Sequence, residues 1–108
     1  MGAFRPSTRE LPAQLIGRAR VYVDTRAGAL SEAGDLVLAV QDGAFRLRDV
    51  AGEIGEVLLG TAAGRSDPRA VTVYKSVGAA FLDAATARLA YAQAAPAGVG
   101  TVYEFDAQ

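Results

Sequence analysis

The stretch that decides the fold is V-T-V-Y-K-S-V-G-A-A-F-L-D-A-A-T-A-R-L-A-Y-A-Q-A-A, residues 71–95. Residues 71–75 are mostly β-branched or aromatic, which is typical of a strand. From Gly78 onward, apolar residues recur at steps of three and four, as a helix requires: Phe81, Leu82, Ala85, Leu89 and Ala92. Pro96 and Gly98 end this pattern. The stretch therefore predicts a strand that leads through a short turn into a long helix.

The turn between this strand and helix is a candidate ligand site. In α/β proteins such a turn lies at the carboxyl end of a strand, where ligands bind, and free amides at a helix start attract anions or carbonyl oxygens. Ser76 can bond a ligand while Lys75 balances negative charge, or Ser76 can cap the helix while Lys75 is solvated. Residue type alone favours the second interpretation, and it favours packing roles for Val77 and Gly78.

Composition sets bounds on the function. The 108 residues fit one domain, and 51% of them are hydrophobic, which is enough for a core. The formal net charge of −1 gives no electrostatic reason to expect nucleic acid or an anionic membrane as a partner. Cysteine and histidine are absent, which excludes disulfides, thiolate chemistry and imidazole catalysis. No apolar run reaches ~18 residues and no signal peptide opens the chain, so we expect a cytoplasmic protein.

Other segments are expected to pack around the 71–95 unit. Residues 20–25, R-V-Y-V-D-T, predict a strand with Val21 and Val23 on one face. The remaining predictions are a short helix over 10–16, a helix over 26–33 capped by Asp24 or Thr25 and ended by Gly34, a helix over 50–59 capped by Asp49 and followed by Gly60, and a strand over 101–105. Residues 35–40 fit a strand or a buried helix equally well.

Strands that alternate with helices predict an α/β fold with parallel pairing. Three strands leave two unprotected sheet edges, which favours a piece of a larger sheet or a chain that associates. Glu32 and Asp35 flank Gly34 and could form a paired-carboxylate site, although a solvated helix end is the simpler interpretation. Neither Gly60–Gly64 nor Gly98–Gly100 completes a phosphate-binding or dinucleotide-binding motif.

Four stretches, in this order and spacing, resemble the carboxyl-terminal third of the ornithine cyclodeaminase/μ-crystallin family. They are G-A-F-R-P-S-T-R-E-L at 2–11, R-V-Y-V-D-T at 20–25, E-A-G-D at 32–35 and T-V-Y-K-S-V-G-A-A-F-L-D-A-A-T-A-R at 72–88. The resemblance covers nearly the whole chain. It implies a partial Rossmann-type parallel sheet with flanking helices, followed by a long C-terminal helix and a terminal strand.

The resemblance also implies a domain division, cofactor and partners. Residues 1–75 would complete a Rossmann NAD(P)-binding domain, and residues 76–108 would return to the substrate and dimerisation domain. Family members are NAD- or NADP-dependent homodimers that act on cyclic imines or amino acids, so we expect a small-molecule substrate and a homo-oligomer. The glycine-rich turn and the ribose-reading acid of the family have no counterpart here. We therefore expect a fragment that is inactive alone, with a stand-alone binding or oligomerisation module as the alternative.

Site residues follow from the same resemblance. Ser76 matches a position that contacts the cofactor, and Val77 one that lies against the substrate. Gly2, Ala3 and Phe4 match the loop that passes the nicotinamide. Ornithine cyclodeaminases place a catalytic aspartate where Phe4 stands, and phenylalanine cannot move a proton. The sequence is thus more similar to the μ-crystallin branch of ketimine reductases, with Glu32 as the candidate proton donor.

Overall fold

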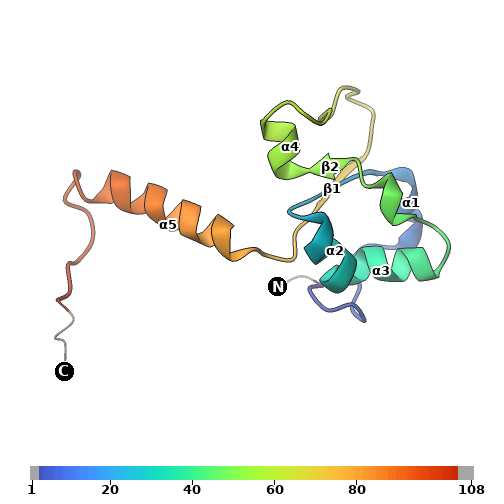
Figure 1. The fold of residues 1–108 in the computed structure, drawn as a ribbon, viewed down its shortest axis with the longest axis horizontal. Helices are drawn as coiled ribbons and strands as arrows, with labels where there is room; N and C mark the ends of the chain where they lie inside the picture. Colours follow the sequence, from blue (N-terminus) through green and yellow to red (C-terminus); the bar gives the residue numbers. More distant parts are fainter. Residues whose placement is uncertain (1–2, 105–108) are drawn as a thin grey trace. The chain divides into compact units, whose positions relative to one another are not determined.

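The computed structural model describes residues 3–104, which fall into two compact units that divide between Gly78 and Ala79 (Figure 1). The first unit contains α1 (Ala13–Arg18), β1 (Arg20–Val23), α2 (Arg26–Glu32), α3 (Gly34–Gln41), the 3₁₀ turn η1 (Leu47–Asp49), β2 (Gly52–Glu53), α4 (Ile54–Leu58) and β3 (Thr72–Lys75). The second unit contains α5 (Ala80–Ala94). No helix among residues 3–104 combines the length and apolarity needed to cross a membrane.

The three strands form a parallel sheet in the order β2-β1-β3, which confirms the predicted α/β class. In this register Val21 lies beside Val73 and Val23 beside Lys75. Figure 1 shows α2 and α3 on one side of the strands and α4 on the other. Because the strands are parallel, their carboxyl ends meet at one edge of the sheet, and residues that follow β1 and β3 become neighbours.

One face of the sheet carries the hydrophobic core. Val21 and Val23 are fully buried on the shared face that their alternation predicted, and Val73 joins them. Their main partners are Ile16 of α1 and Leu36 of α3, both with 0% exposure. The core therefore fixes α1 and α3 against β1 and β3, and it sets the direction in which the strand ends point.

Residues 35–40 are helical, within α3, which settles the alternative left open by the sequence. A contact with a distant part of the chain favours the helix. A Cβ on Gly34 would overlap the carbonyl oxygens of Arg5 and Thr8, so glycine lets the start of α3 press against the amino-terminal loop. Gly34 consequently begins α3, whereas α2 ends at Glu32 and Ala33 joins the two helices.

The helix predicted over 50–59 is wrong in its first half. Residues Gly52–Glu53 pair with β1, and α4 starts only at Ile54. Glu53 takes the N-cap position in place of Asp49, and its backbone N–H donates to the Glu56 carboxylate over 2.8 Å. The chain leaves α4 as predicted, through Gly60 with φ +74°.

The other predicted helices are present with shifted ends. The helix expected over 10–16 is α1, which begins after Pro12, and the helix expected over 26–33 is α2. Thr25 caps α2, because its hydroxyl oxygen accepts the Gly28 N–H over 3.1 Å. Asp24 is thereby left for a different role.

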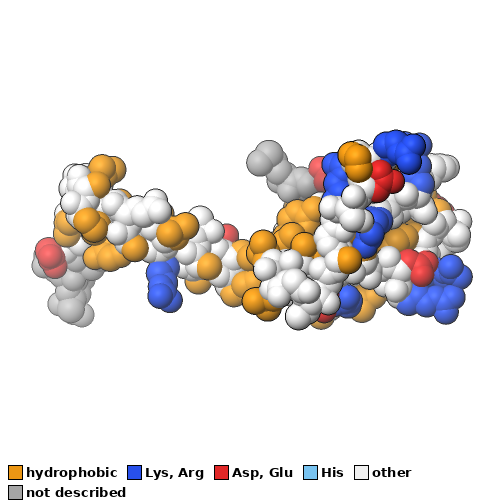
Figure 2. Space-filling view, turned by 90° about the horizontal axis from the view of Figure 1, so that it is seen from above, with side chains coloured by type: hydrophobic (Ala, Val, Ile, Leu, Met, Phe, Trp, Pro, Cys, Tyr) orange, Lys and Arg blue, Asp and Glu red, His pale blue; other side chains and the backbone are white. Residues whose placement is uncertain are grey.

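In the second unit, α5 runs over fifteen residues as predicted, but none of its side chains is buried. Phe81, Leu89 and Tyr91 are more than half exposed, and Figure 2 shows apolar side chains along the surface of this helix. The strand predicted over 101–105 is not formed by residues 101–104, and Phe105 lies outside the described residues. Its β-branched composition finds no neighbouring strand there, and a strand needs one.

Candidate functional site

Asp24 closes the carboxyl edge of the sheet. It follows β1 directly, is 4% exposed, and reaches across to the bend after β3. Its Oδ2 accepts hydrogen bonds from the Ser76 hydroxyl over 2.9 Å and from the Val77 and Gly78 N–H groups, each over 3.0 Å. Its Oδ1 accepts the Thr25 N–H over 2.9 Å. One carboxylate therefore holds the whole bend in place.

The charge on Asp24 is stabilised by these contacts. Burial alone would raise its pKa, but the hydrogen bonds from Thr25, Ser76, Val77 and Gly78 together outweigh burial and lower the pKa below its ordinary value. The carboxylate is therefore ionised at neutral pH. It also occupies two backbone amides of the bend, those of Val77 and Gly78, so these two amides are not open to another anion.

The predicted capping role of Ser76 is wrong. The first helical residue is Ala80, the N-cap is Ala79, and no side chain caps α5. The Ser76 hydroxyl instead donates to Asp24 and accepts the Gly78 N–H over 3.2 Å. The chain turns at Gly78 with φ +89°, a left-handed conformation that favours glycine.

A second carboxylate, Asp35, lies in the first turn of α3 and pairs with Lys75 at the end of β3. Its side chain is fully buried, and its Oδ2 is 2.8 Å from the Lys75 ammonium nitrogen. Its Oδ1 accepts the N–H groups of Glu10 over 2.6 Å and of Leu11 over 2.8 Å. Burial alone would raise the Asp35 pKa, but Lys75 and the two amides lower it below its ordinary value. The solvated positions expected for Lys75 and Asp35 are both wrong.

The reason is the register of the sheet. Lys75 shares a face of β3 with Val73, so its side chain enters the layer between the sheet and α3, with 7% of it exposed. The Glu10 carboxylate lies 3.5 Å from the same ammonium group. A buried ammonium needs such counter-charges, because transfer from water is costly for an unpaired ion.

The amino-terminal loop is connected to this cluster. Glu10 accepts the Ala3 N–H over 2.9 Å, and Ala3 is buried. Phe4, beside it, is 51% exposed, with the Arg5 guanidinium 5.5 Å from its ring centre. Residues of this loop line a pocket of about 410 Å³: Ala3, Phe4, Arg5, Thr8, Arg9 and Glu10. The structure thus links Ala3, through Glu10, to the Lys75 ammonium group at the end of β3.

The other predicted site residues are placed less directly. Val77 is half-buried, against the first turn of α2 near Gly28. Glu32 is exposed, and its carboxylate has no hydrogen bond or ion pair with any residue from 3 to 104. It is the last residue of α2, ~10 Å along the helix from the edge where Asp24 lies. Gly2 is outside the described residues.

The edge where β2 ends carries a third polar cluster. The Glu53 carboxylate accepts the Arg26 N–H over 2.7 Å, and the Arg26 guanidinium is 2.9 Å from Glu56. The Glu53 N–H and then Arg26 lower the pKa of Glu56. The E-x-x-E spacing of a capping box was the available sequence signal. In contrast, no local pattern marks the contacts of Asp24 with Gly78, of Asp35 with Leu11 or of Glu10 with Lys75, because these contacts cross 24 to 65 positions of the chain.

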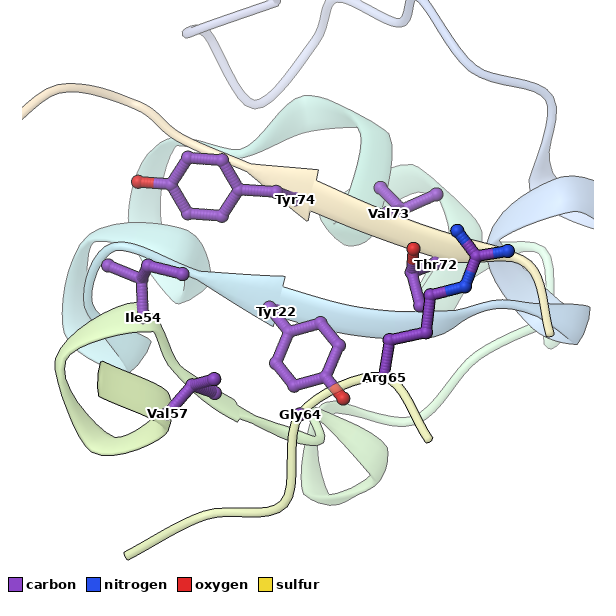
Figure 3. A pocket seen from close by; sticks show the side chains of 8 residues that line it. All are labelled: Tyr22, Ile54, Val57, Gly64, Arg65, Thr72, Val73 and Tyr74. Carbon is purple, nitrogen blue, oxygen red and sulfur yellow. The ribbon is translucent and has the colours of Figure 1, made fainter. Parts of the chain in front are cut away.

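The opposite face of the sheet has an apolar pocket of about 210 Å³ (Figure 3). Its lining is Tyr22, Ile54, Val57, Gly64, Arg65, Thr72, Val73 and Tyr74. The Tyr22 hydroxyl donates to the Ala63 carbonyl over 2.9 Å, which fixes the ring on the floor of this pocket. Within the described part of the chain, no three acidic side chains gather in a way that could hold a metal ion.

Residues 1–97 match the sequence model of the ornithine cyclodeaminase/mu-crystallin family. The chain belongs to this family. Its relatives include the Delta(1)-pyrroline-2-carboxylate reductase of Bacillus cereus, 42% identical over 106 residues, which are 97% of this chain and 33% of that protein. The ketimine reductase mu-crystallin of mouse is 41% identical over 91 residues, 84% of this chain and 26% of that protein.

A solved structure supports the fold. The Delta(1)-pyrroline-2-carboxylate reductase of Thermococcus litoralis, in complex with NADH and L-proline, aligns with a TM-score of 0.79 and 36% identity. The alignment covers 91% of this chain and 30% of that one. The chain therefore spans about a third of the length of the relatives that it matches.

Proposed function

We propose that these residues are part of an NAD(P)-dependent enzyme that reduces a cyclic imine to a cyclic amino acid. The observation that carries this proposal is the match to the T. litoralis reductase, whose complex holds NADH and L-proline. The names of the B. cereus and mouse relatives point to the same imine chemistry. Absence of an aspartate at Phe4 supports reduction over ornithine cyclisation.

The residues present fit one part of the cofactor. Ser76 is exposed at the carboxyl edge, and its neutral hydroxyl suits an uncharged, planar ring. A bound dinucleotide would supply the hydride. Its phosphates need other contacts, because the 108 residues have no G-x-G-x-x-G turn and Asp24 occupies the amides of the bend. We assign Gly2, Ala3, Phe4 and Ser76 to the nicotinamide side and Val77 to the substrate side.

Reduction of an imine also consumes a proton. Asp24 and Asp35 are unsuited to donate it, because contacts lower both pKa values and keep both groups ionised at neutral pH. Glu32 remains the proposed donor. Its free, exposed carboxylate can reach a substrate only if another segment brings that substrate to the end of α2. A Glu32→Gln variant that kept its full rate would rule this assignment out.

We also propose the division into residues 1–75 for the cofactor domain and 76–108 for the substrate and dimerisation domain. The exposed apolar side chains of α5 support it, since a helix that buries no side chain within its own unit gains stability only from a partner surface. The same observation favours the second candidate, a stand-alone association module. Under that candidate the purified chain associates but does not bind a dinucleotide.

A chimera tests the proposed function. The matching third of the B. cereus reductase is exchanged for this chain, which aligns over 97% of its length. We expect the chimera to oxidise NADH or NADPH in the presence of 1-pyrroline-2-carboxylate, and the isolated 108 residues to show no turnover. A chimera that folds and binds NADH, yet fails to reduce the imine, would contradict the proposal. Titration of NADPH into the folded chimera, followed by nicotinamide fluorescence, separates the two candidates, because only the reductase part completes a cofactor site.

A further inference from the structure

One buried ammonium group joins two segments that lie far apart in the sequence. Lys75 ends β3, and its nitrogen lies 2.8 Å from Asp35 and 3.5 Å from Glu10. Asp35 is a buried residue in the first turn of α3, whereas Glu10 belongs to the amino-terminal loop. The lysine therefore sits between the bend after β3 and the loop that precedes α1.

The contacts continue to the tip of the amino-terminal loop. The Glu10 oxygen that faces Lys75, Oε2, is the atom that accepts the Ala3 N–H over 2.9 Å. At the other end of the loop, Asp35 holds the N–H groups of Glu10 and Leu11. The ammonium thus fixes the direction of the Glu10 carboxylate, and that carboxylate fixes the Ala3 backbone.

We infer that Lys75 is a positioning residue, which holds the Ala3–Phe4 segment at the end of β3 through Glu10, while Asp35 fixes the ammonium group. Lys75 touches neither cofactor nor substrate in this account. That this segment faces a nicotinamide rests on the proposed function. The tether from Lys75 through Glu10 to Ala3 rests on the contacts alone. A charged link gives direction that an apolar side chain of the same volume lacks, because only the ammonium orients the Glu10 oxygen.

The test replaces charge by matched neutral groups. Lys75→Met/Asp35→Asn removes both buried charges but keeps the volume and the Asn oxygen that accepts the Glu10 and Leu11 N–H groups. Replacement of a buried ion pair by neutral groups of similar size often preserves stability. Arg46→Met/Asp49→Asn makes the same chemical change in an exposed pair with an N–O distance of 3.0 Å, and it serves as the control.

The first readout is amide hydrogen exchange at Ala3, measured by NMR on the 108-residue chain. Loss of an oriented hydrogen bond to a charged acceptor predicts exchange at least about tenfold faster in the buried double variant, with no change in the control. Exchange in β1 and β3 should stay as in the parent chain. Equal Ala3 exchange in the parent and the buried double variant would overturn the tether. If this variant fails to fold, Glu10→Ala is used instead, since it changes the more exposed partner of Lys75. It must give the same faster Ala3 exchange; unchanged exchange would overturn the tether.

The second readout uses the chimeric reductase. The buried double variant should lower kcat/KM by about tenfold at an unchanged urea midpoint, because a mobile Ala3–Phe4 segment orients the reactants less well without loss of the fold. Unchanged kinetics together with faster Ala3 exchange would overturn the positioning role. A parent chimera without activity would count against the proposed function, and Ala3 exchange would still decide the tether.

Discussion

Replacement of Asp24 by alanine tests the account of the sheet edge most directly. The variant deletes the acceptor of four hydrogen bonds, from Thr25, Ser76, Val77 and Gly78. The donors stay in place. We expect the bend after β3 to loosen from β1, while the core around Val21 and Val23 keeps its packing.

The size of the effect follows from the surroundings of each donor. Hydrogen bonds to a charged group contribute about 1.5–3 kcal/mol each, but bonds to one carboxylate are not additive. The Ser76 hydroxyl and Gly78 N–H are at the surface and can bond water, whereas Thr25 and Val77 are half-buried. Two effective bonds give about 3–6 kcal/mol, and relief of the buried charge lowers this to about 3 kcal/mol.

Urea unfolding at pH 7, followed by far-UV circular dichroism, measures the loss. With a typical slope of about 2 kcal/mol/M, the midpoint of Asp24→Ala should fall by about 1.5 M. Ser76→Ala is the matched control, because it removes one of the four bonds together with its donor and should cost about 1 kcal/mol or less. Equal losses in the two variants, or a loss below about 1 kcal/mol for Asp24→Ala, would refute the argument.

Three further predictions test the core and the buried charges. The Asp35 pKa in the native state is below its ordinary value of 3.8. Its contribution to the free energy of unfolding is therefore complete above pH 3.8 and is lost as the pH falls through the lower native pKa. Measurement of the urea midpoint at a series of acidic pH values checks this. Gly34→Ala should strongly destabilise the fold because its Cβ meets carbonyls of the 5–8 turn, whereas Gly55→Ala, with open space, should be nearly neutral in the same assay. Leu36→Ala, at a fully buried position, should cost about 2–5 kcal/mol in urea unfolding.

Elements with a strong local pattern were predictable from the sequence. The strand at Thr72–Lys75, the bend and α5 follow from a change of period within one stretch, and β1 follows from its alternation. The family resemblance, too, depends on contiguous residues, and the family match over residues 1–97 confirms it. What these features share is that neighbours in the sequence suffice to define them.

Features that depend on tertiary contacts were not predictable in this way. The apolar run at 35–40 fits two structures until Gly34 meets the amino-terminal loop. Residues 101–104 have strand composition but no strand beside them in the described part of the chain. Lysine and aspartate side chains are usually exposed to water. Only the register of β3 and the position where α3 starts reveal that Lys75 and Asp35 pair in the interior.

The charges at the sheet edge limit what that edge can bind. Asp24 and Asp35 are both ionised, and Lys75 compensates Asp35, so these buried groups leave the negative charge of Asp24 next to Ser76. A negative field of this kind disfavours a phosphate and favours a neutral or cationic ring, such as a nicotinamide or an iminium group. Under the proposed function, this edge meets the reacting end of the dinucleotide and not its pyrophosphate, because Asp24 already takes the amides of the bend. Under the proposed function, affinity for the cofactor then has to come from other segments, while this edge orients its ring.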